Sequence, residues 1–249
     1  MPVKNKRISP GTETTRMTVG KAADINLNDI AYTRIKEDII SCALQPGEDI
    51  SEGVLVARYS LGKAPIRHAL MRLRQEGLIT SRGRQGAVVS AIMLRDVQEI
   101  FQLRLVLEVT AVRLAAGQVD KARIRELNQA VHAGYTPGNK ASEATYLRAN
   151  RDFHQYVAES SGNRRLAALV VNLMEQHERI VHLGLALQNR EREFLHSHDD
   201  LVKALIEGDS VGAAQLTETA LRGGQSKVLN ALADSVNQIS VTGLDLSPK

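Results

Sequence analysis

Apolar residues in the first third of the chain recur at helical spacing and predict three helices in succession. The first helix ends at Pro46-Gly47, because proline and glycine interrupt the helical pattern there. The second is short and runs from Ser51 to Tyr59, and the third carries Pro65 in its first turn and ends at Gly77. The apolar positions are Ile30, Ile35, Ile39, Ile40 and Ala43 in the first helix, and Ile66, Ala69, Leu70 and Leu73 in the third.

A tight turn joins the second and third helices at Ser60-Leu61-Gly62, where we expect the glycine to take a positive φ. After the third helix the period of the pattern changes. Residues 78–80 and 87–89 are short β-prone runs on either side of a glycine-containing stretch, which predicts a hairpin. Helix, short helix, turn, helix and hairpin in this order predict a winged helix-turn-helix over residues 27–91.

The remainder of the chain is predicted to be helical, so the fold class is mainly α. Gly162-Asn163 and Gly208-Asp209-Ser210 each combine a helix-ending glycine with an N-cap for the next helix, the second cap being Ser210. Six helices joined by short turns predict an antiparallel bundle over residues 92–233. Residues 1–26 and 234–249 are predicted to be a flexible arm and a flexible tail. The candidate helices are 95–116, 120–133, 142–161, 163–187, 190–207 and 210–233.

The composition is that of a globular protein with no membrane partner. Hydrophobic residues make up 43% and charged residues 24%, and no apolar run approaches the roughly 20 residues of a membrane-spanning helix. The polar N-terminus lacks the apolar core of a secretory signal, and the single cysteine, Cys42, cannot form an internal disulfide. We therefore expect a cytoplasmic protein. Trp is absent and aromatic residues are 3%, which argues against the aromatic platforms that bind single-stranded nucleic acid.

Positive charge is concentrated in the predicted winged helix-turn-helix. Residues 1–90 contain 14 Lys and Arg against 9 Asp and Glu, whereas residues 91–249 contain 18 against 19. A basic patch of this kind attracts double-stranded DNA because each neutralised phosphate releases counterions. Between positions 58 and 84 the only acid is Glu76, and the basic residues are Arg58, Lys63, Arg67, Arg72, Arg74, Arg82 and Arg84.

The third helix is the one that a helix-turn-helix places in the major groove, with its first residues at the base edges. Lys63 and Arg67 are four positions apart and therefore share one face. The Arg67 guanidinium can grip O6 and N7 of a guanine, and Lys63 can bind a phosphate or a base. The hairpin tip can enter the minor groove, where glycine permits close approach and arginine favours the negative potential. The further candidates for DNA contact are Arg58, Arg72, Arg82, Arg84 and Gly86.

Motifs in both halves of the chain match one known family. In the first half they are Pro46-Gly47-Glu48, Ala57, Pro65-Ile66-Arg67, Ala69-Leu70, Arg72-Leu73, Glu76-Gly77-Leu78-Ile79 and Gly86. In the second half they are Arg104, Leu107-Glu108, Phe153-His154, Gly162-Asn163 and the run 198–209. The first set resembles the winged-helix signature of the GntR family of bacterial transcription regulators, and the second resembles the all-helical ligand domain of its FadR (FCD) branch. The resemblance implies a homodimeric repressor of a catabolic or metabolic operon that binds a palindromic operator and responds to a small organic acid.

The resemblance also implies an effector cavity in the bundle, in many members with a divalent metal. Carried over by position, the first two ligands are Asn150 and His154, whose spacing puts them on one helical face. The next is His198, and the last position falls on Ala220, which cannot bind a metal. Two imidazoles and an amide, completed by water or effector, could hold Zn²⁺ or a similar ion. The alternative is that the three side chains line a polar cavity and bind the effector directly.

Arginine residues near the proposed cavity have two possible roles. The resemblance suggests that Arg104 faces inward and pairs with a carboxylate effector. The alternative is a surface ion pair between Arg104 and Glu108, four positions on. Arg148 and Arg151 flank the helix that carries His154 but, at about 100° per residue, point away from the proposed ligand face, and we expect them to be solvated.

Three fragments resemble enzyme motifs, and each fails on geometry. The sequence 208–212 matches Gly-x-Ser-x-Gly but joins two predicted helices, whereas that motif works on a strand-to-helix turn. His177 and His182 are five apart rather than four, and alternate residues such as His196 and His198 do not face each other on a helix. We therefore expect no enzyme. A metal-dependent hydrolase and a DNA-packaging protein are the weaker alternatives.

Overall fold

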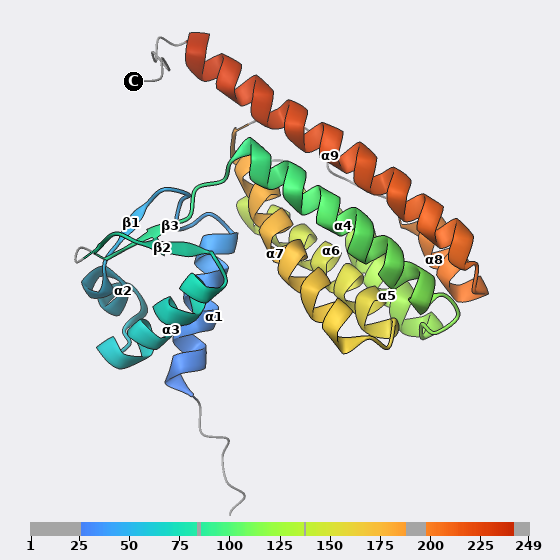
Figure 1. The fold of residues 1–249 in the computed structure, drawn as a ribbon, viewed down its shortest axis with the longest axis horizontal. Helices are drawn as coiled ribbons and strands as arrows, with labels where there is room; N and C mark the ends of the chain where they lie inside the picture. The colour runs from blue at the N-terminus through green and yellow to red at the C-terminus, as the bar shows by residue number, and fades with distance from the viewer. Residues whose placement is uncertain (1–25, 84–85, 137, 188–197, 242–249) are drawn as a thin grey trace, which may run out of the picture.

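The computed structural model describes residues 26–83, 86–136, 138–187 and 198–241. They form a small N-terminal domain and a larger bundle of helices (Figure 1). The predicted arm, except for Asn26, and residues 242–249 of the predicted tail lie outside the described residues. Within the described ranges, none of the helices has the length and apolar composition that crossing a membrane requires.

The N-terminal domain has the predicted winged helix-turn-helix order. Its helices pack their apolar stripes together, and the predicted positions Ile35, Ile66 and Leu73 are fully buried in one core. Ser51 caps the second helix, because its side chain accepts a hydrogen bond from the Val54 N–H. The elements are α1 (Leu27–Ile40), β1 (Asp49–Ile50), α2 (Glu52–Tyr59), α3 (Lys63–Gln75), β2 (Ile79–Ser81) and β3 (Ala87–Val89).

The predicted hairpin belongs to an antiparallel sheet in which β3 lies between β1 and β2. Strand β1 was not predicted, since two residues are too few to show a strand pattern. Ile50 of β1 pairs with Ala87, which brings its backbone close to Gly86. A Cβ at Gly86 would lie 2.7 Å from the Ile50 carbonyl oxygen, and Gly86 has φ +124°. Only glycine fits there, and the reason is packing against β1.

The turn before α3 differs from our expectation. The residue with positive φ is Ser60, at 54°, whereas Gly62 is extended with φ −67° and acts as the N-cap of α3. Short polar residues such as serine visit the left-handed region at modest cost when a helix ends there. The turn was therefore located correctly, but its positive φ belongs to Ser60 and not to Gly62.

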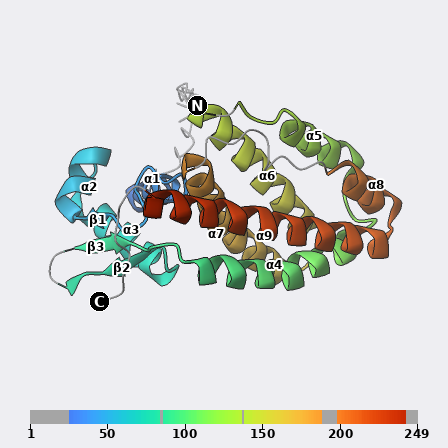
Figure 2. The ribbon, with the colours of Figure 1, turned by 90° about the horizontal axis from the view of Figure 1, so that it is seen from above.

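The second part of the chain is the predicted helical bundle. Its long last helix lies beside α4 in both views (Figures 1 and 2). Phe101 of α4 and Phe153 of α6 are fully buried in the largest core of the bundle. The helices are α4 (Leu94–Ala115), α5 (Lys121–His132), α6 (Lys140–Ser160), α7 (Arg164–Leu187), α8 (Asp199–Glu207) and α9 (Ser210–Val241).

Three boundaries in the bundle differ from the sequence analysis. Helix α9 continues to Val241, past Ala233, where the flexible tail was predicted to begin. Of the predicted helix 190–207, residues 190–197 lie outside the described residues, and His198 is the non-helical N-cap of a helix that begins at Asp199. The N-cap of α9 is Asp209 rather than Ser210, because the Asp209 carboxylate accepts the Gly212 N–H at 2.8 Å. Gly162 and Asn163 take the predicted capping roles.

Buried polar contacts hold the N-terminal domain against α7. Lys36 of α1 forms ion pairs with Glu175 of α7 at 2.7 Å and with Glu76, at the end of α3, at 2.9 Å. Burial alone would lower the pKa of Lys36, but its hydrogen bonds, that to Glu175 first, raise it above its ordinary value. Arg179 of α7 donates to the carbonyl of Ser90, in the segment that joins β3 to α4. The two parts of the chain are thus joined by specific contacts to one helix.

Candidate functional site: a basic helix and a polar cavity

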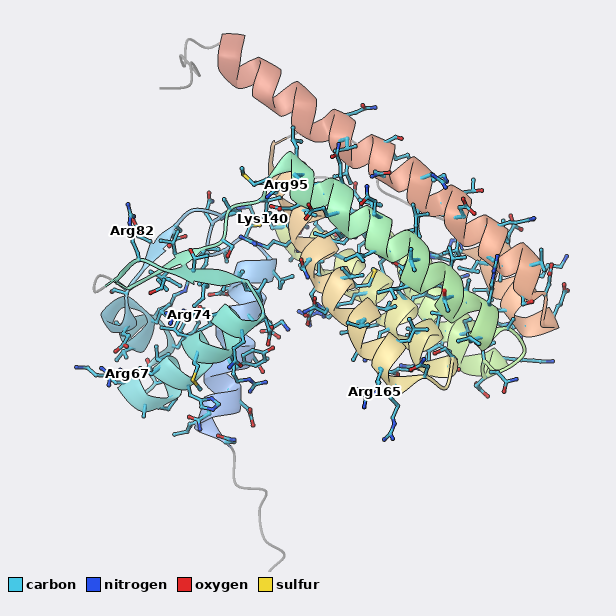
Figure 3. All side chains as sticks on the ribbon, in the orientation of Figure 1. Arg67, Arg74, Arg82, Arg95, Lys140 and Arg165 are labelled. Carbon is cyan, nitrogen blue, oxygen red and sulfur yellow. The ribbon has the colours of Figure 1, made fainter. Side chains whose placement is uncertain are left out.

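The N-terminal end of α3 presents its basic side chains to solvent. Lys63 and Arg67 are both exposed, and the Arg67 side chain is 65% accessible. Figure 3 shows Arg67 projecting from α3 on the side of the domain that faces away from the bundle. The opposite face of α3 is anchored in the core by its apolar stripe. The helix is therefore held rigidly while its basic end stays accessible to a large ligand.

Arg67 is also ordered by a contact with the neighbouring helix. Its Nε lies 2.9 Å and 2.8 Å from the two carboxylate oxygens of Glu52, the first residue of α2. Both contacts use the Nε–H, so the two terminal amino groups of the guanidinium are left for other acceptors. Sequence reasoning did not identify Glu52, because the contact joins residues from separate helices.

Two of the predicted DNA-contacting arginines pair with acids of α1. Arg72 lies over the ring of Tyr32, 3.6 Å from its centroid, and its NH1 is 2.8 Å from the Asp29 carboxylate. Arg58 is paired with Asp38 of α1 at 2.7 Å. Both arginines thus link α1 to a neighbouring helix, while 39% of the Arg58 side chain and 35% of the Arg72 side chain stay accessible.

The hairpin contributes one exposed arginine among the described residues. Arg82 forms an ion pair with Asp49 of β1, and its side chain is 60% accessible. Figure 3 shows it on the sheet side of the domain, away from the bundle. Arg84 lies outside the described residues. The wing thus keeps one accessible cation beside the sheet.

A cavity of about 430 Å³ lies inside the bundle, between α4, α6, α7, α8 and α9. It brings together all four predicted effector residues, which come from three different parts of the chain. Its other lining residues are mainly apolar or uncharged. The predicted residues are Arg104, Asn150, His154 and His198, joined in the lining by Phe101, Glu108, His177, Asp200, Leu201, Thr217 and Ala220.

Arg104 and Glu108 form a buried ion pair in the wall of this cavity. The Arg104 Nε is 2.5 Å from Glu108 Oε1, and each side chain is only 4% accessible. His154 Nδ1 lies 3.1 Å from the other oxygen of Glu108. Burial alone would raise the pKa of Glu108, but the attraction of Arg104 and then of His154 holds it well below its ordinary value. Arg104 thus faces inward, as the resemblance implied, and its ion pair with Glu108 lines the cavity instead of the surface.

Asn150, His154 and His198 occupy one corner of the cavity. The His154 and His198 rings meet edge to face, 5.2 Å apart, and His198 also stacks on Phe153. Asn150 is 8% accessible, and no donor in the described part of the chain reaches its Oδ1. This corner is thus a buried polar site that contains one acceptor without a hydrogen-bond donor in the described ranges.

The donors in this corner match only part of the metal-binding set that the resemblance implied. Ala220 lines the cavity at the position expected for the last ligand and offers no donor. The Nδ1 of His154 already faces Glu108, and Asn150 contributes no charge toward a hard cation. Across the described ranges, no three His, Cys, Asp or Glu side chains are close enough together to hold an ion.

The residues of α7 were only partly understood from the sequence. His177 lines the cavity and meets Phe101 edge to face at 5.3 Å, whereas His182 lies near Glu178, at 3.8 Å, outside it. The two histidines diverge, as their spacing predicted.

The two arginines of α6 that were expected to be solvated differ in burial. Arg151 is half-buried, in a 2.8 Å ion pair with Glu178 of α7. Arg148 is exposed, as expected.

Comparison with known proteins gives one consistent result. Residues 27–89 match the bacterial regulatory proteins of the gntR family, and residues 99–223 match the FCD domain. The uncharacterized HTH-type transcriptional regulator YdhC of Bacillus subtilis is 26% identical over 195 residues, covering 74% of this chain and 83% of YdhC. The HTH-type transcriptional repressor RspR of Escherichia coli is 22% identical over 213 residues, covering 86% of this chain and 90% of RspR. The solved structure of E. coli McbR/YncC superposes with a TM-score of 0.72 at 22% identity, over 83% of this chain and 98% of that chain.

Proposed function

Because the chain belongs to the GntR family of transcription regulators and carries an FCD domain, we propose that it represses a catabolic or metabolic operon by binding a palindromic operator. A small organic acid bound in the bundle modulates this repression. Family membership makes the chain a DNA-binding regulator rather than an enzyme. The observation that supports the proposal most directly is one chain with both an accessible basic α3 and a bundle cavity lined by Arg104, Asn150, His154 and His198. As a regulator of bacterial genes it acts in the cytoplasm.

DNA recognition is assigned to the N-terminal end of α3. Arg67 reads a guanine in the major groove, and Lys63, one helical turn earlier, binds a phosphate or a neighbouring base. Arg82 follows the minor groove from the wing, and we extend this role to Arg84. Arg58 and Arg72 are removed from the contact surface, because their guanidinium groups are engaged with α1.

A second copy of the chain covers an apolar surface on α4 and α7. Leu103, Val106 and Leu114 lie on one side of α4 and are 52%, 64% and 48% accessible, and Leu169 of α7 is 55% accessible. Leu103 and Leu169 line a cavity of about 900 Å³ that opens on this side. Exposed apolar clusters of this kind mark interfaces. A two-fold dimer through this surface carries two α3 helices to the two halves of a palindrome.

The effector binds the cavity directly rather than through a metal. Arg104, His154 and His198 supply positive or donor groups for a carboxylate. The buried Oδ1 of Asn150 requires a donor, because an unsatisfied buried acceptor costs free energy. A small acid that also carries a hydroxyl group meets both requirements.

The effector signal reaches the DNA-binding domain through α7. This helix places His177 in the cavity, while Glu175 and Arg179 contact the N-terminal domain at Lys36 and Ser90. A ligand can change DNA affinity only if it prefers one arrangement of the two parts over another. A displacement of α7 on effector binding supplies that preference.

Footprinting with purified protein tests the proposal. A regulator protects one short palindrome upstream of a gene, and small hydroxy acids found by a thermal-shift screen then change its affinity for that site. A protein that covers DNA broadly without sequence preference would instead be a packaging protein. Equal operator affinity with and without a saturating acid would refute the effector part.

A further inference from the structure

We propose that Glu52 is a positioning residue for base recognition, which holds the Arg67 guanidinium with its terminal amino groups directed at a guanine. This inference rests on the proposed function, in which the N-terminal end of α3 enters the major groove. The observation behind it is the pair of contacts from Arg67 Nε to Glu52, at 2.9 Å and 2.8 Å.

The geometry leaves the useful part of the guanidinium available. Glu52 takes one of the five N–H donors of Arg67, and the remaining donors are on the two terminal nitrogens. Those two nitrogens form the fork that matches O6 and N7 of guanine. An arginine held in this orientation also loses less rotamer freedom when it binds than one that moves freely.

The position of Glu52 is itself fixed by the fold. It is the first residue of α2, and Ser51 caps that helix through the Val54 N–H. Its carboxylate is partly screened from solvent, at 37% accessibility, against 65% for Arg67. The Glu52 side chain is therefore the less exposed member of the pair, which suits a positioning residue.

A carboxylate next to a DNA-binding surface has a second, opposite effect. Its negative charge repels phosphates and weakens binding to DNA of any sequence. Removing the Glu52 carboxylate should therefore raise general affinity for duplex DNA while it lowers the preference for guanine. A residue with only a structural role would not move these two quantities in opposite directions.

Asp29 provides a matched control within the same domain. Like Glu52 it lies in the first turn of a helix and pairs with an arginine of α3, in this case Arg72. Arg72, however, lies over the Tyr32 ring and does not extend toward a base. Asp29→Ala should raise general DNA affinity without changing base preference.

The experiment selects duplexes from a randomised DNA library with the full-length protein. Wild type, Glu52→Ala, Glu52→Asp, Asp29→Ala, Arg67→Ala and Arg67→Ala with Glu52→Ala are compared in parallel. We expect wild type to recover a site with a guanine in each half, and Glu52→Ala to reduce that guanine preference at least about fivefold. Glu52→Asp keeps the charge but shortens the side chain, so it should lose guanine preference without the rise in general affinity. With Arg67 already removed, Glu52→Ala should leave base preference unchanged.

The outcomes separate this inference from the proposed function. If wild type enriches no sequence, the proposed function fails. If wild type enriches a site and both Glu52 variants keep its full guanine preference, the proposed function stands and Glu52 is not a positioning residue. Circular dichroism checks that each variant folds, and Glu52→Asp carries the test if Glu52→Ala does not fold.

Discussion

Replacing Glu108 by glutamine should destabilise the helical bundle strongly. The substitution keeps the size and shape of the side chain but removes the charge that neutralises Arg104 at 2.5 Å. Because both side chains are only 4% accessible, Arg104 would be left as a buried charge without its counter-ion. His154, whose Nδ1 lies 3.1 Å from the same carboxylate, would lose its acceptor as well.

The expected magnitude follows from the burial of the pair. Removing one partner of a buried ion pair costs about 3–5 kcal/mol, far more than the 0–1 kcal/mol of an exposed pair. For a chain of this length each kcal/mol lowers Tm by roughly 2–4 °C, so Glu108→Gln should unfold about 6–20 °C below wild type. Arg104→Met combined with Glu108→Leu should cost much less, because no charge then remains buried.

The pH dependence gives this prediction a second measurement. The pKa of Glu108 is lower in the folded protein than its ordinary value, so the carboxylate stabilises the fold at pH values above the unfolded pKa of about 4.3. This contribution falls as the pH drops from there toward the folded pKa. Thermal scans should show the gap between wild type and Glu108→Gln shrinking in that range. Equal Tm values for the two proteins at pH 7 would refute a buried pair at this position.

The remaining predictions concern DNA, effector, metal and dimer. Arg67→Ala should weaken binding to the selected operator by about 1–3 kcal/mol and relax one base position; an equal loss on scrambled DNA, measured by fluorescence anisotropy, would make it a phosphate contact. His154→Ala should abolish the effector response and spare operator binding in the same assay, and a persisting response would place the effector elsewhere. Addition of Zn²⁺ or of a chelator should leave the Tm of the purified protein unchanged. Elemental analysis of the purified protein should find no zinc, and bound zinc would contradict direct effector binding. Leu103→Glu should convert the dimer to monomers in sedimentation experiments, unless α4 lies outside the interface.

The fold could be predicted largely from local signals in the sequence. The apolar stripe of α3 and the β-prone runs 78–80 and 87–89 are each set by neighbouring residues, and the matching elements were found. The errors lie where a local signal was ambiguous. Gly62 and Ser60 stand in one turn, and the pattern did not show which of them takes the positive φ. Helix α9 was ended early, because the residues after Ala233 were judged by their polar composition, although Leu232, Val236 and Ile239 keep helical spacing.

The candidate site could be predicted only as far as residue type and helical face allow. Asn150 and His154 were placed together correctly, since positions four apart share one helical face. Whether Arg104 pairs in solvent or beside a cavity depends on α9, which covers α4 from a distant part of the chain. Burial therefore decides the role of this arginine, and burial is a property of the packed bundle.

The contacts that matter most for the response were the hardest to foresee. Glu52 with Arg67, and Lys36 with Glu175, each join separate helices and leave no spacing signature in the sequence. In the proposed function the first pair orients Arg67 toward a base, and the second joins the N-terminal domain to α7. The basic residues predicted DNA binding, and we propose that their acidic partners decide which of them reach DNA. On that proposal the difference lies in exposure: Arg67 stays 65% accessible beside Glu52, whereas Arg72 is 35% accessible between Asp29 and the Tyr32 ring.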